Sequence, residues 1–204
     1  MIVIKGKALW SKIFEPDTRF VPEGEYSVQV VVPETEAQDL CEQLDGMAQA
    51  KLEETVKEQP KLKASLSTRQ PYEEDTDELG NPTGNLVFKT KMKARIKSRN
   101  GTVYEQKPAV VDAKRTPMDG NQLVGNGSVI KVAVEPVPYM MASTKQVGVS
   151  LRLKAVQVID LVEYGNSTNS IFDEEEGYVT SAVAKDDASD VFGDEPTTDA
   201  EGDF

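Results

Sequence analysis

The sequence contains no histidine and only one cysteine, Cys41. Without histidine the chain lacks the most common general base and the most common metal ligand, and it cannot form a Ser-His or Cys-His nucleophile pair. A single cysteine excludes an internal disulfide and a zinc site built on several cysteines. We therefore expect no metal, no cofactor and no enzymatic activity, although chemistry that uses carboxylates alone remains possible.

Long apolar runs are also missing. No stretch approaches the roughly 18 apolar residues that span a bilayer, and the first residues contain no apolar segment of signal-peptide length. These absences predict a soluble protein of the cytoplasm. The 204 residues, of which 38% are hydrophobic, suit one domain plus appendages.

Charge is distributed unevenly along the chain, whose net charge is −12 at pH 7. Residues 167–204 hold twelve acids and one base, whereas residues 86–154 hold thirteen bases and four acids. A locally basic body with an acidic tail suggests contact with nucleic acid, combined with an interaction tail.

Six segments are predicted to be strands, and in residues 25–32, 86–99 and the first part of 147–163 apolar residues alternate with polar ones, which is typical of half-buried strands. Helical spacing of apolar residues after Pro33 predicts one helix of about 20 residues that ends before Pro60. Residues 61–85 are expected to form a connection with an acidic loop at 73–78. The predicted strands span residues 2–10, 25–32, 86–99, 102–111, 128–135 and 147–163.

Two local features bear on how these strands are arranged. Asn100-Gly101 is a strong hairpin signal between the third and fourth strands. Beyond Ala155 the apolar phase of the last strand slips by one residue, and such a bulge or bend helps a small barrel to close. We predict a mainly β protein with an OB-fold-like small barrel and one helix.

The predicted domain covers residues 1–165, and an acidic tail covers residues 166–204. The tail is sparse in large aliphatic residues, so it cannot bury enough apolar surface to offset chain entropy. We therefore expect the tail to be disordered.

Residues 89–99 carry a cation at every odd position, and alternate side chains of a strand share a face. The cations would lie about 6.6–6.8 Å apart, an interval comparable to the phosphate repeat of an extended nucleic-acid strand. An ordinary solvated face would mix charge signs, so we favour a DNA-binding face. Its cations are Lys89, Lys91, Lys93, Arg95, Lys97 and Arg99, which could be extended by Lys107, Lys114, Arg115, Lys131, Arg152 and Lys154.

Binding of unpaired nucleotides also needs aromatic rings on which bases stack, each worth about 1–3 kcal/mol. Tyr139 follows Pro136-Val137-Pro138, which would present it at a stiff strand exit. Tyr104 and Trp10 are further candidates, and each ring could instead pack in the core or at an edge.

The chain closes on an acidic segment with a terminal aromatic residue. Carboxylates of such a segment can meet a basic patch while the ring enters an apolar pocket. We assign partner binding to Asp199, Glu201, Asp203 and Phe204.

Several short segments together resemble the gene 2.5 protein family, the replication single-stranded DNA-binding proteins of short-tailed lytic phages. The resemblance covers most of the chain but is poor over residues 40–85. The segments that carry it are Phe88-Lys89-Thr90-Lys91, Val110-Val111-Asp112-Ala113-Lys114, Gly125-Asn126-Gly127-Ser128, Val137-Pro138-Tyr139, Val149-Ser150-Leu151-Arg152-Leu153, Gly177-Tyr178-Val179 and Gly202-Asp203-Phe204.

The resemblance implies an OB-fold homodimer that binds single-stranded DNA without sequence preference in phage replication, recombination and repair, within the infected host cell. It also implies that the acidic tail contacts the phage DNA polymerase and the helicase–primase. Tyr139 matches the family's proposed stacking tyrosine, and Phe204 matches its terminal aromatic residue.

Other functions suit the same residues. The barrel could bind RNA or duplex DNA, or the acidic tail could mimic DNA and occupy another protein. A nuclease could use a metal held by Asp112 and Asp119, or by the acids of residues 73–78.

Overall fold

The computed structural model of the chain describes residues 1–98 and 100–163. The predicted acidic tail over residues 166–204, including Asp199, Glu201, Asp203 and Phe204, lies outside the described residues, as does Arg99.

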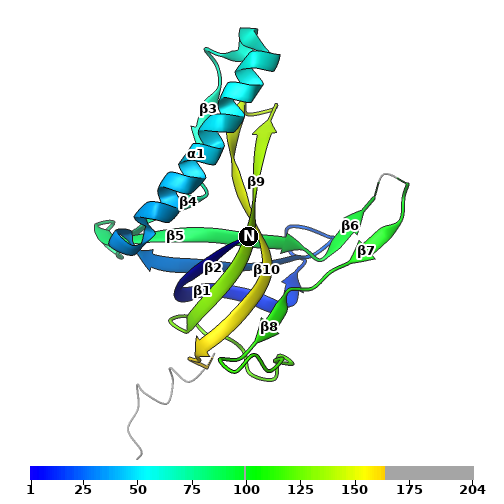
Figure 1. Cartoon of the computed structure of the whole chain (residues 1–204). Coiled ribbons are helices and arrows are strands. Elements are labelled where there is room, and N and C mark those ends of the chain that lie inside the picture. The colour runs from blue at the N-terminus through cyan, green and yellow to red at the C-terminus, as the bar shows by residue number, and fades with distance from the viewer. Residues whose placement is uncertain (99, 164–204) are drawn as a thin grey trace, which may run out of the picture. The chain divides into compact units, whose positions relative to one another are not determined.

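Five long strands form a closed barrel (Figure 1). Neighbours in the order β10-β9-β1-β2-β5 pair antiparallel, and β10 then pairs with β5 in parallel, with Leu151 opposite Thr90. The predicted mainly β barrel is therefore confirmed. Its strands are β1 (Ile2–Asp17), β2 (Glu25–Pro33), β5 (Pro82–Lys93), β9 (Val129–Met141) and β10 (Gln146–Asp160).

Short strands extend this sheet or leave it. β3 and β8 pair in parallel with β10, and β4 pairs with β5, so residues 61–85 are not the plain connection that we predicted. β6 and β7 form a separate hairpin that projects from the barrel (Figure 1), as Asn100-Gly101 indicates. Their bounds are β3 (Ser67–Arg69), β4 (Tyr72–Thr76), β6 (Arg95–Lys97), β7 (Val103–Glu105) and β8 (Ala109–Val111).

The prediction of one continuous strand over residues 86–99 is wrong, because the chain bends at Ala94. The Ala94 N–H donates a hydrogen bond to the Gly24 carbonyl (2.8 Å), and the Ala94 carbonyl accepts one from the Gln106 N–H (2.9 Å). The first bond continues the β5–β2 register by one residue and the second continues the β6–β7 register, so the chain passes from one sheet to the other at Ala94. β5 consequently ends at Lys93, and the chain continues into the hairpin.

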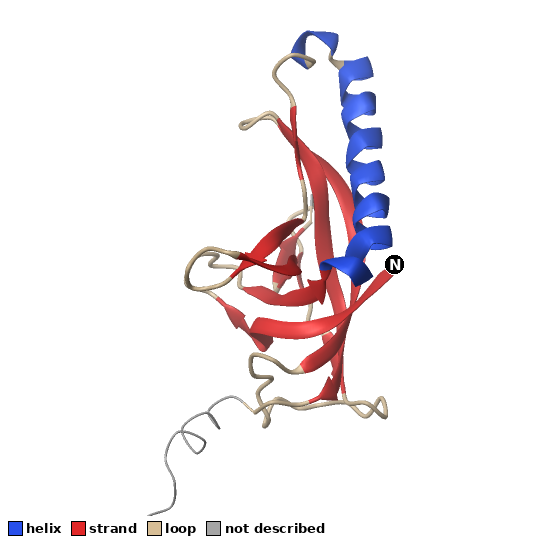
Figure 2. Cartoon of the chain, turned by 90° about the vertical axis from the view of Figure 1, so that its left-hand side faces the viewer, coloured by secondary structure: helices blue, strands red, loops and turns tan. Residues whose placement is uncertain are grey.

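The helix α1 (Glu34–Glu58) is longer than predicted, but it ends before Pro60 as expected. It lies along β9 and β10 (Figure 2), and its buried residues include Leu44 and Ala48. A 3-10 turn (Pro60–Leu62) follows. No helix within residues 1–98 and 100–163 is long and apolar enough to cross a membrane.

The barrel interior is filled by every second side chain of each strand, the ones that point inward. Along β2 these are Tyr26, Val28, Val30 and Val32, all buried, as the apolar alternation predicts. The register of β10 against β9 shifts between Leu153 and Ala155, where the apolar phase slips, so the predicted bulge is confirmed.

The closing contact between β10 and β5 should be sensitive to core truncation. Leu151 is 1% exposed beside that contact, so Leu151→Ala should lower the free energy of unfolding by about 2–5 kcal/mol. Leu123→Ala, at a side chain that is 50% exposed, should change it by less than about 0.5 kcal/mol. Urea unfolding followed by circular dichroism measures both, and equal losses would contradict a core role for Leu151.

Candidate nucleic-acid interface

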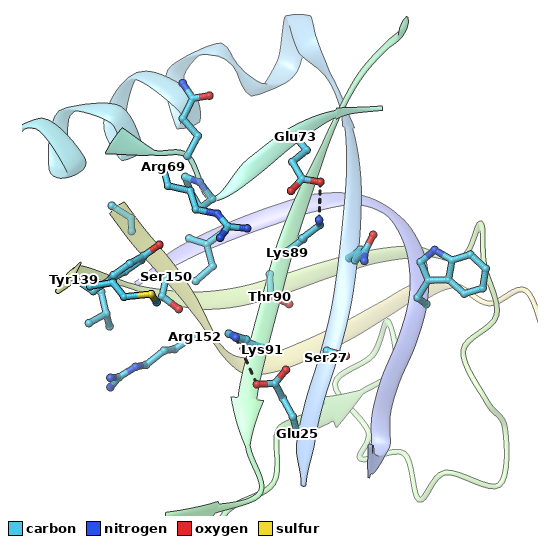
Figure 3. Close-up of a pocket in the computed structure, with 18 residues that line it drawn as sticks. Glu25, Ser27, Arg69, Glu73, Lys89, Thr90, Lys91, Tyr139, Ser150 and Arg152 are labelled. Atoms are coloured by element: carbon cyan, nitrogen blue, oxygen red, sulfur yellow. Dashed lines mark hydrogen bonds and ion pairs between the residues drawn. The ribbon is translucent and has the colours of Figure 1, made fainter. Parts of the chain in front are cut away.

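A cleft of about 630 Å³ lies over the outer face of the barrel (Figure 3). Outward side chains of β2, β5 and β10 form part of its lining, and β1, β9 and the β3–β4 segment supply the rest. Along β5 the inward residues Phe88 and Thr90 are buried, so Lys89 and Lys91 point outward. The barrel's alternation thus sets which side chains reach the cleft.

Three predicted cations line the cleft, namely Lys89, Lys91 and Arg152. Lys91 lies opposite Arg152 where β5 and β10 pair, so barrel closure brings together two cations that are distant in sequence. Arg69 also lines the cleft and was missed by the sequence analysis. It ends β3, a three-residue strand too short to show any periodicity.

Tyr139 lies at one side of the cleft, near Ser150 (Figure 3). The expected strand exit at this residue is wrong, because β9 continues through Pro136-Val137-Pro138 to Met141. Tyr139 is half-buried and lies opposite Gly148 of β10. A Cβ added to Gly148 would be 3.0 Å from the Tyr139 hydroxyl oxygen, so the absence of a side chain at 148 makes room for the ring.

Trp10 also lines the cleft, and its side chain is 68% exposed. Its φ is +51°, and the β1–β2 register shifts between Leu9 and Lys12. The Trp10 N–H donates to Asn126 Oδ1 (2.8 Å) instead of a strand partner. A bulge in β1 therefore exposes the ring of Trp10, although the residues on either side of it belong to the strand.

The other predicted residues within the described ranges do not line this cleft. The bend at Ala94 moves Arg95 and Lys97 onto the hairpin, so the cations of residues 89–99 do not form one row. Arg95 and Lys107 line a second hollow beside Tyr26, and Tyr104 is 56% exposed on β7. The remaining predicted cations in the described ranges are all exposed, namely Lys93 at the end of β5, Lys114 and Arg115 after β8, Lys131 on β9 and Lys154 on β10.

The expectation of a face with a single charge sign is also wrong, because neighbouring strands supply acids. Lys154 is 2.8 Å from Glu135, and hydrogen bonding from Lys154 lowers the pKa of the Glu135 carboxyl. The other three pairs are Lys89–Glu73 at 2.6 Å, Lys91–Glu25 at 3.6 Å and Arg95–Glu105 at 3.0 Å.

The acids considered for a nuclease serve as turn acceptors or strand residues. Asp112 Oδ1 accepts hydrogen bonds from the backbone N–H groups of Thr116 (2.7 Å) and Lys114 (2.8 Å), and those bonds lower its pKa. Asp119 accepts hydrogen bonds from the backbone N–H and the side-chain amide of Asn121. Within the part of the chain that the structure describes, no three acidic or cysteine side chains are grouped to hold a metal ion.

Comparison with known sequences gives consistent matches. The family model described as single-stranded DNA-binding protein, bacteriophage T7, matches residues 8–161. The single-stranded DNA-binding protein of Escherichia phage T7 is 28% identical over 173 residues, which cover 80% of this chain and 75% of that protein. That of Enterobacteria phage T3 is 27% identical over 117 residues, covering 57% of this chain and 50% of that protein.

Solved structures share the fold. The crystal structure of gp2.5, a single-stranded DNA-binding protein encoded by bacteriophage T7, matches with a TM-score of 0.67 at 24% identity, covering 88% of this chain and 99% of that one. The single-stranded DNA-binding protein from bacteriophage Enc34 in complex with single-stranded DNA matches with a TM-score of 0.50 at 13% identity, covering 79% and 86%. These likenesses confirm the predicted OB-fold-like architecture.

The contact between Tyr139 and Gly148 can be tested by adding one methyl group. In Gly148→Ala the new Cβ would lie 2.6 Å from the Arg69 carbonyl oxygen, so the Tyr139 ring and β3 should both shift. Altered NMR signals of the Tyr139 ring and faster amide exchange in β3 would report the shift. Gly46→Ala, at a helical site where the new Cβ would meet no atom within 4 Å beyond its own stretch of helix, should leave these signals unchanged. Unchanged Tyr139 signals in Gly148→Ala would contradict the packing described.

Proposed function

Because the chain belongs to the family of the single-stranded DNA-binding protein of bacteriophage T7, we propose that it binds single-stranded DNA without sequence preference in the cleft beside Tyr139. One observation carries the proposal: a single cleft contains the cations Lys89, Lys91 and Arg152 together with two aromatic rings, those of Tyr139 and Trp10. The family is one of binding proteins and not of enzymes.

The chemistry of the cleft suits an unpaired strand. Phosphates would lie along the cations of β5 and β10, while bases stack on Tyr139 and Trp10, because every base has a face that can stack on a ring. β2 and β5 are the second and third strands of the barrel, and this is the face with which OB-folds bind oligonucleotides. Stacking and phosphate contacts read no base edges, so binding would be independent of sequence.

The predicted residues outside the cleft would extend the path of the bound DNA strand over the protein surface. Lys93 continues β5 toward the hairpin, where Arg95, Lys97 and Tyr104 could contact further nucleotides. We assign weaker, electrostatic contacts to Arg99, Lys107, Lys114, Arg115, Lys131 and Lys154.

The acidic tail would couple DNA binding to recruitment. In the free protein the tail would compete for the cleft, and a tethered ligand acts at an effective concentration of up to about millimolar. Bound DNA would displace the tail, and its end, from Asp199 to Phe204, would then bind the phage DNA polymerase and the helicase–primase. We propose that homodimers coat unpaired strands in this way during replication and recombination in the infected host cell.

Replacing Tyr139 tests the stacking role. Tyr139→Ala should weaken binding of an oligo-dT strand by about 1–3 kcal/mol, since one stacked base is lost. Tyr139→Phe keeps the ring and should bind nearly as well as the unmodified chain. Fluorescence anisotropy at fixed salt measures both, and an Ala variant that binds normally would show that the ring only packs against β10.

Competition separates this function from binding of RNA or duplex DNA. Unlabelled single-stranded DNA, RNA and duplex of equal length should displace a labelled single strand with different efficiency, and single-stranded DNA should be the most effective. A chain without its tail that fails to bind any nucleic acid would instead favour the DNA-mimic alternative.

Removing residues 184–204 tests the role of the tail. The shortened chain should bind single-stranded DNA more tightly at low salt, because a competing anion is gone, and it should no longer capture the phage DNA polymerase. Phe204→Ala in the full chain retains every carboxylate side chain, so it separates the contribution of the ring from that of charge. Unchanged DNA affinity of the shortened chain at low salt would contradict competition by the tail.

A further inference from the structure

Two lysines of the cleft are already paired with carboxylates of the protein itself. Lys89 Nζ lies 2.6 Å from Glu73 Oε2, and Lys91 Nζ lies 3.6 Å from Glu25 Oε2 (Figure 3). Both glutamates line the same cleft as Tyr139. A DNA phosphate that binds either lysine therefore competes with that carboxylate for the same ammonium group.

The two glutamates come from the strands on either side of β5. Glu73 belongs to β4, which pairs with one edge of β5, and Glu25 is the first residue of β2, which pairs with the other edge. All four side chains are partly exposed, from 26% for Glu25 to 59% for Lys91. Ion pairs this exposed are weak, so the carboxylates compete with a phosphate without blocking it.

A displaced carboxylate does not leave the cleft. It remains next to the bound strand and repels the phosphates there, and this repulsion grows with the charge density of the ligand. Duplex DNA is more densely charged than a single strand, as its steeper salt dependence per contact shows, about 0.9 against about 0.7. The same two carboxylates therefore disfavour duplex DNA more than single-stranded DNA.

We propose that Glu73 and Glu25 are specificity-determining residues, whose carboxylates hold two phosphate-binding lysines and make the cleft discriminate against duplex DNA. This inference rests on the proposed binding of single-stranded DNA in this cleft. Stacking on Tyr139 compensates an unpaired strand for displacing the carboxylates. A duplex offers the rings no accessible base faces along its length, so it meets the repulsion without that compensation.

Glu74 provides a matched control for Glu73. It is the next residue of the same strand, it is exposed, and it is not among the residues that line the cleft. In the described part of the chain it forms no ion pair within 4.0 Å. Glu73→Gln and Glu74→Gln therefore remove the same charge at adjacent positions, and only Glu73→Gln frees Lys89.

The experiment measures the affinities of the full chain for oligo-dT and for a duplex of equal length by fluorescence anisotropy over a series of salt concentrations. Glu73→Gln should tighten duplex binding by up to about fivefold, the limit expected for one exposed ion pair, and single-strand binding by less, so that the ratio of single-strand to duplex affinity falls. The log–log salt slope should steepen by up to about 0.7 for the single strand and about 0.9 for the duplex. Glu25→Gln should act in the same direction.

Controls separate this inference from general charge effects. Glu74→Gln should leave the affinity ratio unchanged, and in a Lys89→Gln background Glu73→Gln should lose its effect, because the two residues act as a pair. Equal changes for Glu73→Gln and Glu74→Gln, or a ratio that Glu73→Gln does not alter, would overturn the proposal. Failure of the unmodified chain to bind single-stranded DNA would instead refute the proposed function.

Discussion

The parallel pairing of β10 with β5 is the constraint on which the rest of the structure depends. It closes five strands into a barrel and buries Leu151 beside Thr90, whose hydroxyl donates a hydrogen bond to the Val28 carbonyl. On the outer face the same pairing aligns Lys91 with Arg152, residues that are far apart in the chain. Because inner and outer side chains alternate along each strand, the contact that completes the core also assembles the floor of the cleft.

Most of the barrel could be predicted from the sequence because its strands are long and half-buried, which produces clear alternation, as in β2. The bulge before Ala155 and the helix end before Pro60 were visible for equally local reasons. The bend at Ala94 was not, because its cause is hydrogen bonding to Gly24 and Gln106, which only the folded chain brings near. β3 and β4 were missed because neither short strand shows alternating burial of apolar residues.

The residues of the candidate site also fall into those that the sequence indicates and those that only the fold brings together. Lys89 and Lys91 could be found in the sequence, since outward positions follow from strand periodicity. Tyr139 was also found, but from an expected strand exit that the structure does not contain and from the family resemblance. The acids that pair with the lysines could not be found, because Glu25 and Glu73 are distant from Lys91 and Lys89 in the sequence and become their neighbours only across the sheet. Counting charges along one strand therefore overstates how positive its surface is. The property that matters is the charge of a face, and every strand beneath that face contributes to it.

The packing of Tyr139 over Gly148 has a consequence for the thermodynamics of binding. Ordering a free side chain on association typically costs about 0.5–1.5 kcal/mol. Here the ring lies against the backbone of β10 in the β9–β10 pair, the longest antiparallel pairing of the barrel, so much of that ordering is completed when the chain folds. A nucleotide that stacks on Tyr139 meets a preorganised surface, and the conformational entropy of the ring is lost in folding instead of in each binding event.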